Sequence, residues 1–136
     1  MNDEMNMTTI TPFLMFTGQA KKALSLYERC FSDFSIMQCD EYPEGEERMQ
    51  GKIHYAVISI HGQQLAVIDS PVEHAFDFTP SLSLMVEFTD VKAIQQAYAK
   101  LTDGGEILMP LDRYDFAAQY AWINDPFGVS WQLKVV

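Results

Sequence analysis

Apolar positions along the first half of the chain change their spacing in a fixed order. Residues 10–16 form a mostly apolar run, and a stripe at helical spacing begins at Ala20. Three later segments, 34–41, 52–60 and 64–68, tend towards the alternation of apolar and polar residues that is typical of strands. The pattern therefore predicts the order strand, helix and three strands.

The second half repeats this order. A strand is predicted over residues 82–88, a second helical stripe begins at Val91, and three further strands are predicted over 106–110, 119–124 and 129–135. The two stripes lie about 70 residues apart, close to half of the 136-residue chain. The sequence therefore contains a faint internal duplication.

Residues at the ends of the two predicted helices support this division. Thr17 is a candidate cap of the first helix, and Thr89 or Asp90 is a candidate cap of the second, because short polar side chains accept hydrogen bonds from the first helical N–H groups. The pair Gly104-Gly105 is expected to end the second helix.

A unit with one helix leaves one face of its sheet uncovered. Two such units side by side predict an α+β fold of tandem βαβββ modules, in which a curved mixed sheet surrounds a cleft. We expect residues 1–136 to form a single domain made of two halves, about 8–70 and 80–136, with residues 69–80 as the connection.

Composition and charge narrow the range of functions. Hydrophobic residues make up 48% of the chain, enough for a core, and the formal net charge of −10 disfavours nucleic acid and anionic membrane surfaces as partners. The N-terminus carries Asp3 and Glu4 instead of the basic and apolar segments of a secretory signal. Cys30 and Cys39 lack metal-ligand spacing. These features predict a cytoplasmic protein.

The most specific motifs lie in the last third of the chain. They are Thr102-Asp103-Gly104-Gly105, Met109-Pro110-Leu111-Asp112 and the block DPFGVSWQL over Asp125–Leu133; His54-Tyr55-Ala56, His61-Gly62 and Asp69 add a weaker match. With these residues the chain resembles the PhnB/YjdN-like branch of the glyoxalase/bleomycin-resistance/dioxygenase (vicinal oxygen chelate) superfamily from about Thr8 onward. The resemblance implies the fold predicted above and a homodimer.

Members of this branch often carry the label 3-demethylubiquinone-9 3-methyltransferase-like. A nucleotide-like cofactor would require a glycine-rich turn between the first strand and its helix, and the sequence has none there. We therefore predict no cofactor.

The resemblance also implies where a divalent metal ion would sit. Metalloenzymes of the superfamily bind it through side chains on the first, fourth, fifth and eighth strands, which correspond here to positions near Pro12, Asp69, Ser83 and Gln132. Proline has no side-chain donor, and neutral serine and glutamine are weak ligands. We predict that the usual metal site is absent, while a different site that uses His54 and Asp69 stays open.

Polar and aromatic side chains around the predicted cleft are candidates for binding a small molecule. The polar segment 112–116 is interpreted as a loop that covers the cleft mouth with its two aromatic residues pointing inwards. The ligand-binding candidates are Ser83, Gln132, Trp122, Tyr114 and Phe116.

One pair of residues supports acid/base chemistry. His54 lies within an apolar strand and Asp69 ends a later strand, so pairing across neighbouring strands would allow the carboxylate to orient the imidazole. The competing interpretation is structural, with a neutral histidine in a hydrogen-bonded pocket and an aspartate that caps a turn.

The leading hypothesis is a protein that binds a small molecule in a cleft without the usual metal ion. One alternative is a metal- or His54-dependent enzyme with lyase, dioxygenase or methyltransferase-like activity. The other is a dimer that sequesters a cationic drug, which the negative charge of the chain would attract.

Overall fold

The computed structural model describes residues 7–136, so Asp3 and Glu4 lie outside the described part. The elements are β1 (Phe13–Phe16), α1 (Ala20–Cys30), β2 (Phe34–Glu41), β3 (Ile53–Ile60), β4 (Gln63–Asp69), β5 (Leu84–Phe88), α2 (Val91–Thr102), β6 (Glu106–Tyr114), β7 (Ala117–Asn124) and β8 (Ser130–Val135). The order strand, helix, three strands occurs twice, as the spacing of apolar residues predicted.

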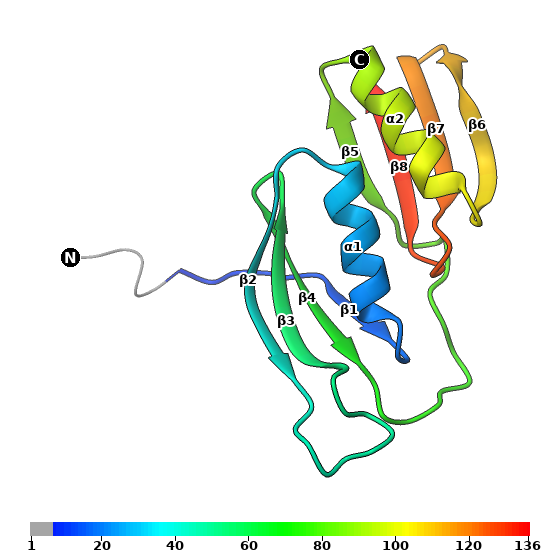
Figure 1. The fold of residues 1–136 in the computed structure, drawn as a ribbon. Helices are drawn as coiled ribbons and strands as arrows, with labels where there is room; N and C mark the ends of the chain where they lie inside the picture. Colours follow the sequence, from blue (N-terminus) through cyan, green and yellow to red (C-terminus); the bar gives the residue numbers. More distant parts are fainter. Residues whose placement is uncertain (1–6) are drawn as a thin grey trace. The chain divides into compact units, whose positions relative to one another are not determined.

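The strands form two four-stranded mixed sheets with the same topology (Figure 1). The strand order is β1-β4-β3-β2 in the first sheet and β5-β8-β7-β6 in the second. In each sheet the first strand of the module runs parallel to its last strand, and the other neighbours are antiparallel. The predicted α+β fold of tandem βαβββ modules is confirmed.

Contacts divide the chain into two compact units. The first unit contains residues up to Ala20 together with 33–71, and the second contains 21–32 together with 72–136. Almost all of α1 therefore belongs to the same unit as the second sheet. The division of the sequence into duplicated halves at about 8–70 and 80–136 concerns the sequence pattern and stays a prediction.

The first sheet has one buried face. Leu14, Val67 and Ala56 are aligned by the strand register and are at most 7% exposed. One position along the strands, Met15 and Ile68 pair on the opposite face, where both are half-buried. Alternation with a period of two thus separates a core face from a more open face.

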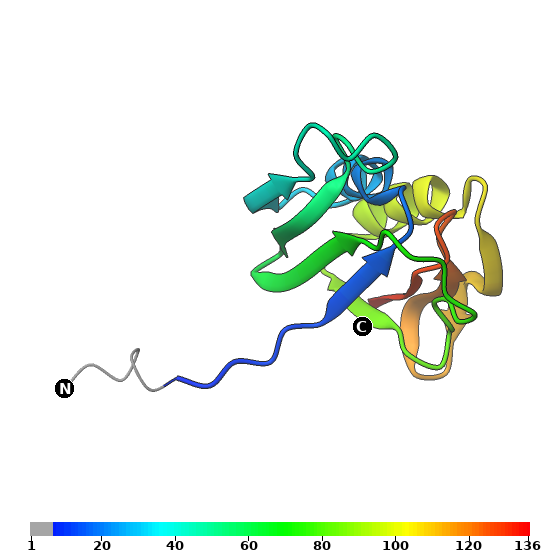
Figure 2. The ribbon, with the colours of Figure 1, turned by 90° about the horizontal axis from the view of Figure 1, so that it is seen from below.

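Trp131 on β8 is the centre of the core of the second unit. Its side chain is 1% exposed, and the rings of Tyr27 from α1 and of Phe31, which directly follows α1, lie with their centroids 5.1 and 5.2 Å from it. On α2, Ile94 and Leu101 are fully buried, and Figure 2 shows this helix against one face of its sheet. Both helices bury most of the apolar stripe that the sequence predicted, although Val91, at the start of the second stripe, is 44% exposed.

The two helices begin differently. Asp90 caps α2, as predicted, and its carboxylate accepts a hydrogen bond from the Lys92 amide at 3.1 Å. At the start of α1, the Ala20 amide donates to the carboxylate of Asp69, which comes from β4, at 3.0 Å. The cap predicted at Thr17 is therefore wrong, because a long-range partner takes the position that a local side chain was expected to fill.

The segment 112–116 is also a correction. β6 continues to Tyr114, and only Asp115 and Phe116 form the turn to β7. β6 is an edge strand whose pairing with β7 contains three register shifts, and its polar side chains face water. Irregular edge strands tolerate charged residues and proline, so polarity alone does not indicate a loop there.

Candidate functional site

The strand register gives the second sheet an open face with polar character. Gln132 on β8 lies between Met85 on β5 and Trp122 on β7. Its neighbours Trp131 and Leu133 point to the opposite face and are buried. Gln132 itself is half-buried, so a polar amide lies in the middle of this face.

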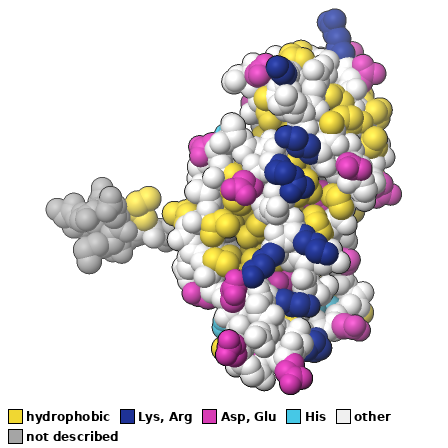
Figure 3. Space-filling view, in the orientation of Figure 1, with side chains coloured by type: hydrophobic (Ala, Val, Ile, Leu, Met, Phe, Trp, Pro, Cys, Tyr) yellow, Lys and Arg dark blue, Asp and Glu magenta, His cyan; other side chains and the backbone are white. Residues whose placement is uncertain are grey.

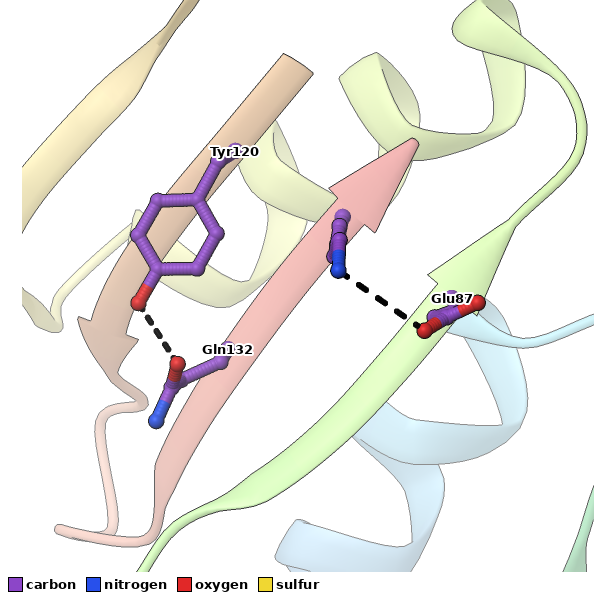
Figure 4. A network of polar contacts seen from close by, with 4 residues as sticks. Glu87, Tyr120 and Gln132 are labelled. Atoms are coloured by element: carbon purple, nitrogen blue, oxygen red, sulfur yellow. Dashed lines mark hydrogen bonds and ion pairs between the residues drawn. The ribbon is translucent and has the colours of Figure 1, made fainter. Parts of the chain in front are cut away.

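A chain of hydrogen bonds fixes the orientation of this amide. Gln132 Nε2 donates to Ser83 Oγ at 2.7 Å. Gln132 Oε1 accepts from the Tyr120 hydroxyl at 2.6 Å, as Figure 4 shows. We call these three residues the amide chain. Tyr120 is 6% exposed, and burial, followed by the neighbouring Tyr114, raises its pKa. The hydroxyl therefore keeps its proton at neutral pH and remains a donor to the amide.

An ion pair lies beside the amide chain on the same face. Lys134 is aligned with Tyr120 on one side and with Glu87 on the other, and its Nζ lies 4.0 Å from the Glu87 carboxylate (Figure 4). The Glu87 side chain is largely exposed, so the pair contributes little to stability. The pair places one charge of each sign at the edge of the amide chain.

Tyr120 also joins the amide chain to an aromatic cluster. The ring centroids of Tyr114, Phe116 and Tyr120 lie 4.8 to 5.7 Å apart, with Tyr120 in edge-to-face contact with the other two. The Tyr114 hydroxyl donates to the Pro110 carbonyl at 2.8 Å, which anchors the cluster. A hollow of about 560 Å³ at the β6–β7 turn is lined by residues 113–118 and by Val136.

Trp122 lies next to Gln132 in the strand register. Its indole N–H donates to Ser130 Oγ at 3.0 Å, and the side chain is half-buried. The indole ring thus has its polar atom satisfied within the sheet. Its apolar surface extends the open face beside the amide chain.

The donors at the superfamily's metal positions do not fit a divalent ion. Pro12 offers no side-chain donor, Ser83 and Gln132 hydrogen bond to each other, and Asp69 is 1% exposed. Within residues 7–136, no group of three His, Cys, Asp or Glu side chains is placed to hold a metal ion. The other open position, a metal at His54 and Asp69, lacks a third ligand of these types among the described residues.

Asp69 holds backbone amides of the first unit. Its Oδ1 accepts from the amides of Gly18 at 2.8 Å and Ala20 at 3.0 Å, and its Oδ2 accepts from the Ile53 amide at 3.0 Å. The carboxylate thereby fixes the turn into α1 and the start of β3. Both oxygens are used by these donors, so the side chain is already engaged in structural hydrogen bonds.

His54 lies near this network. Within the described residues 7–136, it forms no hydrogen bond to the Asp69 side chain. The imidazole is exposed and lies with its centroid 4.8 Å from the ring of Tyr42, whose hydroxyl donates to the Asp69 backbone carbonyl at 2.9 Å. Tyr42 thus contacts both the His54 ring and the backbone of Asp69. Acid/base catalysis by His54 and Asp69 stays a prediction.

Asp125, in the turn between β7 and β8, is a buried carboxylate of the second unit. It accepts from the Tyr27 hydroxyl at 2.6 Å, the Trp131 indole at 2.9 Å and the amides of Phe127 and Val129 at 2.8 and 3.1 Å. Burial raises the pKa of Asp125, although these four donors oppose the rise, and burial raises the pKa of Tyr27 well above its usual value. This network ties α1 to the β7–β8 turn.

A family model described as 3-demethylubiquinone-9 3-methyltransferase matches residues 8–134. The chain belongs to this family. No curated protein matches the chain.

Solved structures agree with the family. A putative 3-demethylubiquinone-9 3-methyltransferase, the PhnB protein of Bacillus cereus, is 39% identical, with 95% of this chain and 100% of that chain covered and a TM-score of 0.89. A Pseudomonas aeruginosa protein is 23% identical, with 95% and 98% covered and a TM-score of 0.78. The fosfomycin resistance protein FosX of Listeria monocytogenes is 8% identical, with 93% and 91% covered and a TM-score of 0.65, and shows the shared fold alone.

The resemblance to the PhnB-like branch of the glyoxalase/bleomycin-resistance/dioxygenase superfamily is thus confirmed. In this PhnB-like chain the second unit brings four of the predicted ligand-binding residues into the amide chain and the aromatic cluster, and it places the fifth beside them. They are Ser83, Gln132, Tyr114 and Phe116, with Trp122 as the fifth. Among the described residues no helix is long and apolar enough to cross a membrane.

The residue that connects this site was missing from the predicted set. Tyr120 is one of several aromatic residues in the last third of the sequence, and most of these were expected in the core. Its position two residues before Trp122 on the same strand is the available signal, because alternate residues of a strand share a face.

Proposed function

We propose that this PhnB-like protein binds a small, flat organic molecule on the open face of its second sheet. The observation that carries the proposal is the continuity of the amide chain and the aromatic cluster through Tyr120. The amide chain supplies fixed polar groups, and the cluster supplies apolar ring surface. Ligand sites commonly combine a few convergent polar groups with an aromatic lining.

The chemistry of Gln132 suggests what the molecule carries. A side-chain amide has two N–H donors and an oxygen with two lone pairs, and one of each is used within the amide chain. The second donor and the second lone pair are available to a ligand. A planar molecule with an adjacent acceptor and donor would satisfy both while its ring packs against Phe116 and Tyr114.

We also propose that no divalent ion binds at the superfamily's usual position. Binding a metal there through Gln132 and Ser83 would require breaking the hydrogen bond between them, and neutral oxygens give little in return. The family name refers to a methyltransferase, and His54 with Asp69 remain the residues for an enzymatic alternative. That alternative stands second, because the Asp69 oxygens already accept three amide hydrogen bonds.

The remaining proposals concern assembly and location. A homodimer would cover edge strands such as β2, where Ile36 and Met37 are 51% and 56% exposed. A reducing cytoplasm suits two cysteines that are both thiols. Sequestration of a flat cationic drug rests on the net charge and on the aromatic lining. It stands behind the binding of a flat neutral molecule, because the amide of Gln132 offers both a donor and an acceptor and no charge.

The ligand experiment compares two glutamine variants. A panel of planar heteroaromatic compounds, each with a neighbouring donor and acceptor, is screened for an increase in the melting temperature of the wild type. Gln132→Leu should abolish the increase, whereas Gln96→Leu, an exposed glutamine of α2, should leave it unchanged. Compounds that stabilise Gln132→Leu as well as the wild type would contradict the proposed site.

The metal experiment uses the same proteins and, in addition, the variant His54→Ala. Elemental analysis of wild type, Gln132→Leu and Gln96→Leu after purification without chelators should find less than stoichiometric divalent metal in all three. Stoichiometric metal that Gln132→Leu loses and Gln96→Leu keeps would show the usual site to be intact. Metal that is lost in His54→Ala instead would favour the enzymatic alternative.

A further inference from the structure

The helical side of the second unit contains a hollow that the proposed function does not use. It measures about 310 Å³ and lies between α1, the end of α2 and the β7–β8 turn. Lys22 and Arg29 of α1 and Lys100 of α2 line it. Figure 3 shows Lys and Arg side chains gathered over the two helices. The chain has only nine Lys and Arg residues in total, so three at one hollow is a strong local concentration.

Two of these cations are held in place. The Arg29 guanidinium donates from Nη1 to Ser25 Oγ at 3.1 Å, and Lys100 Nζ donates to the Arg29 backbone carbonyl at 2.8 Å. Each bond uses one donor of a group that has several. The remaining donors are therefore available to a bound anion, and the two bonds reduce the side-chain entropy that such an anion would have to remove.

The lining contains more positive than negative charges. Asp103 lines the same hollow, yet within residues 7–136 it forms no ion pair with Lys22, Arg29 or Lys100. The effect of the cations extends to Cys30, where the charges of Lys100 and Arg29 oppose the rise in pKa that burial causes. The hollow is thus a positive region in a chain whose net charge is −10.

We propose that this hollow binds the phosphate group of a small phosphorylated molecule. Three cations and the single carboxylate of Asp103 leave a net charge of about +2 at the hollow, which matches a phosphate dianion, and guanidinium and ammonium donors form charge-assisted hydrogen bonds with phosphate oxygens. Leu26 and Phe127 also line the hollow and offer apolar surface to the rest of the molecule. The site involves the helices, whereas the amide chain lies on the open face of the sheet, so the two sites bind independently.

Pyrophosphate is the probe for the test, and backbone amide shifts in two-dimensional NMR spectra report its binding. The double variant Lys22→Gln/Arg29→Gln removes two cations from the hollow. The matched control Lys21→Gln/Lys92→Gln changes the net charge equally, and its two lysines are exposed on the same helices outside the lining. Circular dichroism and the melting temperature confirm that both variants fold.

We expect pyrophosphate to shift amides within 22–29 and 100–103, and to bind the Lys22→Gln/Arg29→Gln variant at least about tenfold more weakly than the control. Gln132→Leu should bind it like the wild type, which separates this site from the proposed function. Equal weakening in both double variants would show a bulk charge effect and overturn the proposal. The proposal would also be overturned if the wild type did not bind pyrophosphate. The same holds if citrate bound as tightly as pyrophosphate and depended in the same way on Lys22 and Arg29.

Discussion

Replacing Asp69 by Ala should strongly destabilise the first unit. The side chain is 1% exposed and its carboxylate accepts from the amides of Gly18, Ala20 and Ile53. Alanine removes both acceptor oxygens, and with them all three hydrogen bonds, and leaves the Ala20 and Ile53 amides buried without a partner. Asparagine repairs this only in part, because its NH₂ group would face an amide N–H that needs an acceptor.

The size of the effect follows from these bonds. A hydrogen bond to a charged group contributes about 1.5–3 kcal/mol net, and two of the three bonds lie in the buried interior. The Gly18 amide is only part-buried, so water can replace its partner. Asp69→Ala should therefore lower the free energy of unfolding by about 4 kcal/mol. In a chain of this length that corresponds to a drop in melting temperature of roughly 10–15 °C.

Urea unfolding followed by circular dichroism measures this difference, with His54→Ala as the control. The imidazole of His54 is exposed, so the control should change the free energy of unfolding by less than about 1 kcal/mol. A melting temperature of Asp69→Ala within about 3 °C of the wild type would refute the reasoning. In that case the carboxylate would be dispensable for the fold, and a catalytic role beside His54 would gain support.

Three further predictions concern the second unit and the thiols. Burial raises the pKa of Cys30 to about 11, so at pH 8 only about 0.1% of this side chain is thiolate. Iodoacetamide should therefore label Cys39 first in the folded protein and both thiols in urea. Peptide mass spectrometry measures the labelling of each cysteine. Tyr120→Phe should lower the free energy of unfolding by about 1 kcal/mol in urea titrations, because Gln132 loses a donor. The raised pKa of Asp125 means that ionisation of this carboxyl group opposes folding. The free energy of unfolding of the wild type, relative to that of Asp125→Asn, should therefore fall as the pH rises from about 3.8 through the pKa of the folded state. Urea unfolding at each pH measures this difference.

The order of elements was predictable because each one follows a local period. The stripes that begin at Ala20 and Val91 both became helices, and the alternating segments became strands. Boundaries were less predictable where partners are distant. Asp69 caps the start of α1 although it lies 49 residues away in the sequence. The residues around Thr17 do not indicate this distant partner. The edge position of β6 likewise became visible only when the sheet was assembled.

The sequence predicted which residues belong to the candidate site, but it did not predict which of them contact one another. Ser83 and Gln132 were predicted as ligand-binding candidates from the sequence, and the structure joins them directly at 2.7 Å. The position of His54 and Asp69 on neighbouring strands was not enough to bring their side chains together. Asp69 alternates onto the buried face with Val67, where backbone amides surround its carboxylate. A strand position gives the face of a side chain, but its partners depend on the loops that close over that face.

Comparison of the two modules explains why the proposed ligand site lies on one of them. Their topologies are the same, yet the more open face of the first sheet carries Met15 paired with Ile68, whereas the matching strands of the second pair Met85 with Gln132. Duplication of a fold preserves the periods that build strands and helices, and it leaves the residues of an uncovered face free to diverge. An apolar pair binds no polar ligand by itself. The amide of Gln132, with Tyr120 and Ser83 to orient it, therefore gives the second unit a binding chemistry that the repeated fold alone does not supply.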